Sequence, residues 1–257
     1  MNPRVTTIGV SLKAYLDPDQ TSGWAARIGE IALSNEAILR GAVEMFVMPA
    51  MPSLAATQAA LAHTVVSVGA QDLFWADRGA YTGAVSGADL RDIGCRLVEV
   101  GHHERRQYFG EDDQTINLKT AAAFRNSLIP VLCVGEVEEV TSSAAVEQCV
   151  GQLESALYAS NASEARQTLI VAYEPVWAIG AERPASSGHI NAVAKGIHQH
   201  LSEYKWLDNV RVIYGGSAQV GLLPQLSDDI DGLFLGRFAH DPESLAAILD
   251  DALVPRK

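Results

Sequence analysis

The segment Leu169–Gly180, LIVAYEPVWAIG, joins a short apolar run to a polar turn. Residues Leu169–Tyr173 are apolar at every position, so both faces of a strand formed there would be buried. Such strands are typical of a parallel sheet that helices cover on both sides. Glu174 follows at once, and the segment therefore predicts a buried parallel strand that ends at a carboxylate.

Seven further apolar runs recur along the chain at regular spacing. They are Val5–Val10, Val43–Met48, Val65–Val68, Arg96–Val100, Ile129–Val134, Val210–Tyr214 and Ile230–Leu235. Stretches with helical character lie between them, at Ser53–His63, Asp113–Asn126, Ala144–Ala159, His189–Tyr204 and Asp241–Ala252. We expect Asp113 to cap the second of these helices and Pro242 to occupy the first turn of the last.

Eight strands that alternate with helices in 257 residues indicate an α/β protein, a single (β/α)₈ TIM barrel domain over residues 1–257. The alternative is a doubly wound sheet, which usually carries a glycine-rich turn after its first strand. Here the first strand runs into SLKAY, residues 11–15, and no Pro/Gly/Ser-rich linker divides the chain. The barrel is therefore the favoured fold.

The composition excludes several classes of protein. With 19 basic and 31 acidic side chains the net charge is −12, so the chain lacks the basic surface that nucleic-acid binding requires. A hydrophobic content of 48% excludes disordered and fibrous proteins. We expect no signal peptide and no membrane span. Cys95, Cys133 and Cys149 show no metal-binding spacing, which predicts buried, reduced thiols in a cytoplasmic protein.

Active sites of (β/α)₈ barrels lie at the carboxyl ends of the strands, so polar residues there are the candidates. Ser11 and Lys13 follow the first strand on one face, where the lysine could reach an anion or be an ordinary surface residue. His102 and His103 follow the fourth strand, and an imidazole there could donate to a carbonyl or play a structural role. Neighbouring side chains on a strand point apart, so we expect no shared metal ion. Ion pairs of residues 104–106 are expected to hold this loop.

Glu174 lies where an apolar strand meets Pro175 and Trp177. Apolar surroundings raise the pKa of a carboxylate and suit a general base, whereas a helix-capping glutamate is the structural alternative. The following segment, Ala178–Ser187, has a rigid entry and a glycine tip at Gly180. This pattern predicts a hinged lid over the site.

Two glycine turns follow the last two strands. They are YGGS at Tyr214–Ser217 and LGRF at Leu235–Phe238. Glycines let backbone amides approach an anion, and this pair of loops is the usual phosphate site of such barrels. The residues together predict a phosphorylated small molecule that undergoes proton transfer beside a carbonyl without any cofactor or metal.

Six motifs resemble those of the triosephosphate isomerase family, in its order and spacing over essentially the whole chain. They are VGAQDLFWADRGAYTGAVS (Val68–Ser86), VEVGHHERRQYFGEDD, PVLCVGE, AYEPVWAIG, YGGS and DGLFLGR. The resemblance implies the roles established for that family: a proton-shuttling Glu174, a carbonyl-polarising His102 and an enediolate-stabilising Lys13. It implies that backbone amides of the lid and glycine turns hold the phosphate, at Gly180, Ser217, Gly236 and Arg237. Glu104 would be a supporting carboxylate.

The same resemblance implies the assembly and the setting of the enzyme. The Gln71–Ser86 segment is similar to the family's dimer loop, so we expect a homodimer in which Thr82 reaches the neighbour's active site. Neither a cofactor nor a metal is expected. Glycolysis and gluconeogenesis are the expected pathways.

The chain departs from the family pattern around the substrate. The family usually has Asn-Trp-Lys-Met-Asn where this chain has Ser11-Leu12-Lys13-Ala14-Tyr15, so a short hydroxyl replaces an asparagine. His103 replaces a serine, and the lid tip reads Gly180-Ala181-Glu182-Arg183 in place of Gly-Thr-Gly-Lys. Arg237 replaces the second glycine of the phosphate turn. The serine and the Gly-Arg pair also occur in isomerases of erythrulose phosphates.

Three functions follow as hypotheses. The leading one is an aldose–ketose isomerase that interconverts dihydroxyacetone phosphate and glyceraldehyde 3-phosphate, because the three catalytic groups are retained. The alternative is a tetrulose-phosphate isomerase, in which Ser11 and a relaxed lid make room for another hydroxymethyl group. A different class is a non-catalytic sugar-phosphate-binding barrel.

Overall fold

The computed structural model describes residues 5–162 and 166–256, and its eight strands close into one parallel barrel. The strands are β1 (Thr6–Ser11), β2 (Val43–Met48), β3 (Ser67–Ala70), β4 (Leu97–Val100), β5 (Ile129–Val134), β6 (Gln167–Tyr173), β7 (Leu207–Tyr214) and β8 (Gly232–Leu235). Each strand pairs with the next in the sequence, and β1 also pairs with β8. The predicted barrel is confirmed, and the doubly wound alternative is wrong.

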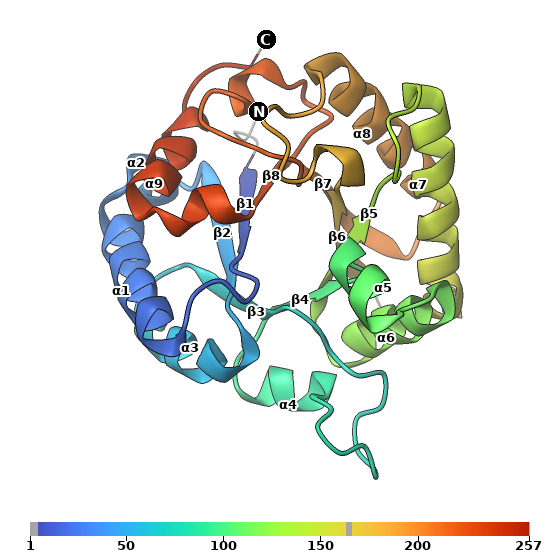
Figure 1. Ribbon diagram of the computed structural model, residues 1–257, viewed down its shortest axis with the longest axis horizontal. Coiled ribbons are helices and arrows are strands. Elements are labelled where there is room, and N and C mark those ends of the chain that lie inside the picture. The colour runs from blue at the N-terminus through green and yellow to red at the C-terminus, as the bar shows by residue number, and fades with distance from the viewer. Residues whose placement is uncertain (1–4, 163–165, 257) are drawn as a thin grey trace.

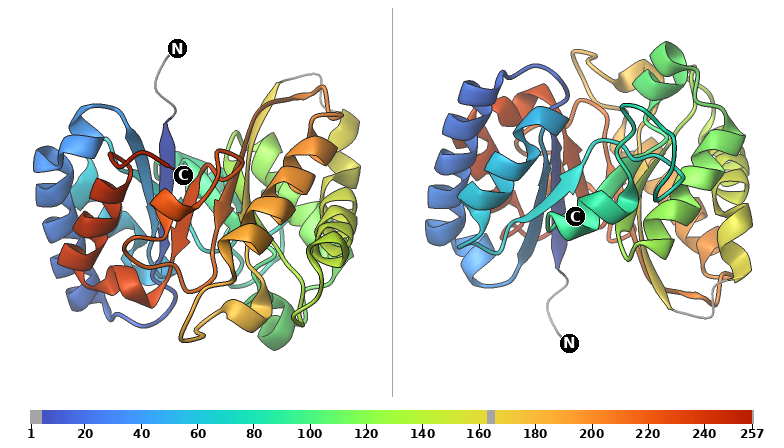
Figure 2. Two further views of the ribbon diagram at one scale, coloured as in Figure 1. Left: turned by 90° about the horizontal axis from the view of Figure 1, so that it is seen from above. Right: turned by 90° about the horizontal axis from the view of Figure 1, so that it is seen from below.

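Helices form a ring around the barrel, as Figure 1 shows down the barrel and Figure 2 from the sides. They are α1 (Pro18–Ser34), α2 (Glu36–Leu39), α3 (Leu54–Leu61), α4 (Gly87–Asp92), α5 (His103–Phe109), α6 (Asp113–Arg125), α7 (Ser142–Leu157), α8 (Ser187–Leu201) and α9 (Pro242–Asp251). Short 3₁₀ turns are η1 (Met51–Ser53), η2 (Tyr158–Ala162), η3 (Val176–Ala178), η4 (Leu223–Gln225) and η5 (Arg237–His240). No helix in the described ranges is both long and apolar enough to cross a membrane.

Side-chain caps fix where several helices begin. Asp241 accepts a hydrogen bond from the Ser244 N–H, with Pro242 in the first turn of α9 as predicted. The prediction that Asp113 caps α6 is wrong by one residue. Asp112 has the extended backbone of a cap, and its carboxylate accepts from the Thr115 N–H.

Three differences from the expected elements have physical causes. The third strand begins at Ser67, two residues after the predicted Val65, because its pairing with β2 begins there and Val65 remains exposed. Helix α1 was not anticipated, although Asp17 and Gln20 form a capping box at its start. Helix α5 buries none of its side chains, so it has no apolar stripe from which a helix could be predicted.

The core has two parts. One lies between the strands and the surrounding helices, and the other fills the barrel interior. Inside the barrel Gly9 is required by packing, since a Cβ there would lie 2.2 Å from the Phe46 ring. Cys95, Cys133 and Cys149 are buried and free, as predicted. The filled interior leaves the carboxyl ends of the strands as the place for a site.

The Gln71–Ser86 loop projects away from the barrel beside α4 (Figure 1). Its base is closed by a parallel bridge between Phe74 and Ser86, and the Phe74 N–H donates to the Val85 carbonyl at 2.7 Å. The Phe74 ring lies 4.7 Å from that of Tyr81, measured between centroids. The loop is thus an ordered projection with side chains of its own packed inside it.

Candidate active site

A pocket of about 560 Å³ lies at the carboxyl ends of the strands. Nine of the predicted site residues line it: Ser11, Lys13, His102, Glu104, Glu174, Gly180, Ser217, Gly236 and Arg237. His103 instead lines a neighbouring cavity beside the ends of β5 and β6, and Thr82 lies on the exposed loop. The fold therefore gathers residues from widely separated strand ends around one cavity.

Glu174 follows β6 and is buried, with 6% of its surface exposed. Its Oε2 has no hydrogen-bond partner among the described residues. Gly215 leaves room for it, because a Cβ there would lie 2.6 Å from Glu174 Cγ. Burial and then the charge of Glu99 raise the pKa of Glu174 to about 8. A carboxylate in this state has a free oxygen and, once ionised, is a stronger base than ordinary glutamate.

His102 caps helix α5 with its ring. Its Nδ1 accepts a hydrogen bond from the Glu104 N–H at 3.2 Å, so the proton of the neutral ring lies on Nε2. That Nε2 is 3.5 Å from Glu174 Oε2. Burial and then the charge of Lys13 lower the pKa of His102 to about 2. The side chain is therefore a neutral imidazole that can donate a hydrogen bond at the pocket.

Lys13 adopts a positive φ of 51° just after β1. Its Nζ donates to Glu104 Oε1 at 2.7 Å, and Gln71 Nε2 donates to the Lys13 carbonyl at 3.0 Å. Burial alone would lower the pKa of Lys13, but the hydrogen bond and charge of Glu104 raise it. The ammonium group is thus charged and held at the edge of the pocket, where it can stabilise an anion.

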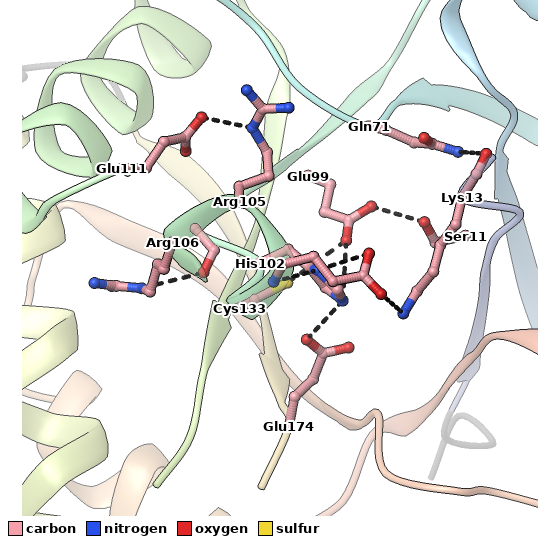
Figure 3. Close-up of polar contacts among 12 residues, drawn as sticks. Ser11, Lys13, Gln71, Glu99, His102, Arg105, Arg106, Glu111, Cys133 and Glu174 are labelled. Carbon is pink, nitrogen blue, oxygen red and sulfur yellow. Dashed lines mark hydrogen bonds and ion pairs between the residues drawn. The ribbon is translucent and has the colours of Figure 1, made fainter. Parts of the chain in front are cut away.

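Three further groups lie beside these residues, and Ser11 is the one among them that lines the pocket (Figure 3). Ser11 Oγ donates to Glu99 Oε2 at 2.9 Å. Cys133 Sγ lies 4.0 Å from Glu99 Oε1, and His102 Nε2 lies 4.0 Å from the same oxygen. Burial raises the pKa of Glu99 to about 7. A second buried carboxylate therefore lies next to the pair formed by His102 and Glu174.

The ion pairs expected beside the histidines are present, although they belong to helix α5 and not to a loop. Arg105 contacts Asp72 at 2.9 Å, and Arg106 contacts Asp113 at 2.7 Å. Lys119 is buried and also contacts Asp72. The Arg105 pair joins the base of the projecting loop to α5, the helix that His102 caps, whereas the Arg106 pair joins α5 to α6 and the Lys119 pair joins the loop to α6.

The opposite end of the pocket carries the glycine turns. Ser217 has a φ of 27° and donates through Oγ to the Ala181 carbonyl at 2.8 Å. The exposed Arg237 lies beside the lid, since a Cβ on Gly180 would be 3.4 Å from its guanidinium. Gly236 precedes Arg237 on the pocket wall. This end combines backbone amides with one cation, which suits a phosphate.

The lid that was predicted at residues 178–187 rests on two hydrogen-bonded anchors. At its far end the Ala185 N–H donates to the Tyr214 hydroxyl at 3.0 Å. At its entry Trp177 Nε1 donates to Glu136 Oε1 at 2.9 Å, and the Tyr173 hydroxyl donates to the same carboxylate. Glu136 is wholly buried, so this entry is fixed to the barrel. Between the anchors, Gly180, Ala181 and Glu182 line the pocket.

One group of side chains in the described ranges has metal-ligating character. His102, His103 and Glu174 present ligand atoms within 4.8 Å of one another. The prediction that the two histidine side chains point apart is wrong, because His102 ends the strand segment and His103 opens α5. Their ring centroids are 4.4 Å apart.

Sequence reasoning missed Glu99, Cys133 and Glu136 as site residues. Glu99 sits inside the apolar run VEV, and a carboxylate in a buried strand is the signal that would have singled it out. Glu136 ends the motif PVLCVGE, again directly after a buried strand. Cys133 carries no such signal, because a thiol in a strand is ordinary core.

Comparison with known proteins assigns the family. The family model described as triosephosphate isomerase matches residues 6–252. The chain is 49% identical over 252 residues to an L-erythrulose-1-phosphate isomerase of Pectobacterium atrosepticum, covering 98% of this chain and 97% of the relative. It is 44% identical to a triosephosphate isomerase of Moorella thermoacetica over 80% of this chain and 85% of that one. An L-erythrulose-1-phosphate isomerase of Rhizobium etli is 36% identical over 95% and 91%. The chain therefore belongs to the triosephosphate isomerase family of enzymes.

Proposed function

We propose that this isomerase moves the carbonyl group of a phosphorylated four-carbon ketose, erythrulose 1-phosphate, to the neighbouring carbon. The observation that carries the chemistry is the free Glu174 Oε2, 3.5 Å from the Nε2 of a neutral His102. The full-length similarity to the Pectobacterium atrosepticum isomerase and the short Ser11 side chain support the four-carbon substrate. Ser11 lines the pocket where the family carries a longer asparagine.

The reaction proceeds through an enediolate. Ionised Glu174 takes the proton from C3, and the electrons form a C2–C3 double bond as the C2 carbonyl oxygen gains negative charge. The His102 Nε2–H donates to that oxygen, and the Lys13 ammonium stabilises the charge. Proton exchange between the two oxygens and return of the carbon proton to C2 leave the carbonyl at C3. Numbered from the other end, the product is erythrulose 4-phosphate, and no atom is gained or lost.

The phosphate is held at the opposite end of the pocket. The backbone amides of Gly180, Ser217, Gly236 and Arg237 are the proposed donors, with the Arg237 guanidinium as an added cation. The lid anchored at Tyr214 excludes water from the enediolate, which would otherwise lose its phosphate. Glu104 keeps Lys13 charged and in place.

A three-carbon substrate is the second candidate, and one observation favours it. Glu174, His102 and Lys13 act on two adjacent carbons and their oxygens, and their arrangement is indifferent to what lies beyond those carbons. The triosephosphate isomerase of Moorella thermoacetica is 44% identical to this chain. Dihydroxyacetone phosphate would undergo the same proton transfer, from C1 to C2.

The test measures wild-type turnover on erythrulose 1-phosphate and on dihydroxyacetone phosphate, each at saturating and low concentrations. We expect kcat/KM to be higher for the four-carbon substrate. Exchange of substrate carbon-bound hydrogen with solvent deuterium, followed by NMR, is expected for wild type and lost in Glu174→Gln. Exchange that persists in Glu174→Gln would contradict the base, and binding without any exchange would identify a sugar-phosphate-binding barrel instead.

We also propose a homodimer formed through the Gln71–Ser86 loop in the cytoplasm. Trp75 and Tyr81 on this loop are partly exposed, as surfaces that pack against a partner are. Thr82, at the exposed part of the loop, would reach the neighbour's pocket. The three free, buried thiols support a reducing compartment. Light scattering of wild type and of Tyr81→Glu is expected to give a dimer and a monomer, respectively.

A further inference from the structure

Glu99 is a buried acid that the reaction described above does not use. It lies on β4 with 3% of its surface exposed, beside the apolar cluster of the barrel interior. Removing a carboxylate from water costs several kcal/mol unless partners compensate for the loss. The contacts of its two oxygens therefore show whether hydrogen bonds within the fold compensate for burying this carboxylate.

The two oxygens of Glu99 differ in their partners. Oε2 accepts the Ser11 hydroxyl at 2.9 Å, which is a full hydrogen bond. Oε1 has the Cys133 thiol at 4.0 Å, a weak donor at the limit of its range, and His102 Nε2 at 4.0 Å, beyond hydrogen-bond distance. Lys13, the nearby cation, makes its ion pair with Glu104. One oxygen is thus left without a strong donor.

Glu99 is not itself among the residues that line the pocket, but its hydrogen-bond partner Ser11 is. Ser11 and His102, which flank Glu99, both line the cavity (Figure 3). A group entering between them could donate to Oε1 while the Ser11 hydroxyl keeps its hydrogen bond to Oε2. A phosphate would be repelled there by the carboxylate, and an apolar group would leave the oxygen unpaired. A hydroxyl fits, because it is uncharged and can donate a hydrogen bond to Oε1.

We infer that Ser11 and Glu99 form a subsite for the terminal hydroxymethyl group of a four-carbon ketose phosphate. The inference rests on the proposed function and names the residues that select its substrate. In both candidate substrates the phosphate and the two reacting oxygens are held by the glycine turns, His102 and Lys13. Only the four-carbon substrate has a further hydroxyl beyond the carbon that loses its proton, at the end away from the phosphate.

The charges around Glu99 support a hydrogen-bond donor beside its Oε1. Burial raises the pKa of Glu99, and the charges of Glu104 and Asp72 raise it further, whereas Ser11 and Lys13 lower it. A hydroxyl donated to Oε1 would stabilise the ionised form in the same way as Ser11 does. The bound substrate would thereby complete the hydrogen bonding that the empty pocket leaves unfinished.

Substrate selectivity of Glu99→Gln tests the subsite. Glutamine keeps the shape and can accept from Ser11, but it places an NH₂ donor where the hydroxyl needs an acceptor. We expect kcat/KM for erythrulose 1-phosphate to fall about 10- to 100-fold, and that for dihydroxyacetone phosphate to change less than about 3-fold. Ser11→Ala should lower the ratio of kcat/KM for erythrulose 1-phosphate to that for dihydroxyacetone phosphate by about 3- to 10-fold. Glu44→Gln, at the opposite end of the barrel, is the matched carboxylate control and should leave both values unchanged.

Binding gives a second readout that does not need turnover. Erythritol phosphate and glycerol phosphate lack a carbonyl and differ by one hydroxymethyl unit. The difference between their binding free energies, measured by calorimetry, therefore reports on the subsite. Glu99→Gln should weaken only the four-carbon compound. Equal losses with both compounds, or an unchanged ratio in both assays, would overturn the subsite. Wild type that fails to turn over erythrulose 1-phosphate overturns the proposed substrate and the subsite with it. If wild type turns over erythrulose 1-phosphate and Glu99→Gln and Ser11→Ala keep the wild-type substrate selectivity, the subsite alone is overturned.

Discussion

Two sides of the same pocket follow different rules. The proton-transfer side consists of Glu174, His102 and Lys13, which match the family pattern. The substrate side consists of Ser11 and Arg237, which depart from that pattern, and Glu99, which sequence reasoning missed. The two sides share strands: Ser11 ends β1 and Lys13 follows it, and Glu99 lies within β4 and His102 follows that strand. A barrel strand can therefore carry a reaction group and a fitting group two or three residues apart, so that one can change while the other is kept.

The two sides also differ in how their electrostatics arise. On the proton-transfer side, burial drives the pKa values of a glutamate and a histidine in opposite directions, to about 8 and about 2. On the substrate side, Arg237 stays exposed and Glu99 is only half satisfied. Changes on the first side should thus reduce turnover of every substrate, and changes on the second should alter which substrate is preferred.

The largest effect is expected for Glu174→Gln. Glutamine keeps the shape but cannot accept the carbon proton, so kcat should fall about a thousandfold with three- and four-carbon substrates alike. Coupled assays measure the loss, and circular dichroism checks the fold. A fall in kcat with only one of the substrates would contradict the assignment of Glu174 to a proton-transfer side that serves both.

Gly215→Ala should have the next largest effect. Its Cβ would lie 2.6 Å from Glu174 Cγ and 2.7 Å from Oε1, so the carboxylate must move. We expect kcat to fall about 10- to 100-fold for both substrates, since small displacements of a catalytic group are costly. Gly188→Ala is the control, because a Cβ there meets nothing within 4 Å. Wild-type kcat in Gly215→Ala would show that Glu174 tolerates displacement.

Arg237→Gly restores the family residue on the substrate side. Loss of the guanidinium beside the lid should raise KM about 3- to 10-fold, with little change in kcat, because the arginine is exposed and its charge is screened. The effect should shrink as salt is added. Arg166→Gly, at the other end of the barrel, provides the comparison. An unchanged KM at low salt would remove Arg237 from phosphate binding.

The smallest effect tests how far the two sides influence each other. The charge of Glu99 raises the pKa of Glu174, so Glu99→Gln should lower that pKa. The base is then ionised at lower pH, and the acidic limb of the kcat/KM profile should move down by about half to one pH unit. Ser11→Ala keeps the charge and should not move the limb downward. A shift to higher pH in Glu99→Gln would contradict the coupling.

The barrel could be predicted because each buried parallel strand is a short apolar run, and all eight runs correspond to strands. Helices were predictable where an apolar stripe faces the core, as in α8. Helix α5 was not, because it buries nothing and depends on the His102 cap. Such a helix can be recognised from the hydrogen bonds at its ends and not from the spacing of its apolar residues.

Most of the pocket could be predicted because its residues follow strands, where polar side chains interrupt apolar runs. Glu99 was missed because it lies within a strand, and its partner Ser11 is 88 positions away in the sequence. Only the closure of the barrel brings that hydroxyl to that carboxylate. Glu136 was missed although it follows β5, because its partner Trp177 is 41 residues away in the sequence and the folded barrel brings the two together.

The buried thiol between the two acids has a consequence for chemical resistance. Burial, together with the charges of Glu174 and Glu99, keeps the pKa of Cys133 well above its usual range. Alkylating agents and peroxides attack the thiolate, which is almost absent here at neutral pH. A cysteine beside the active site is therefore protected by its burial and by the charges of Glu174 and Glu99.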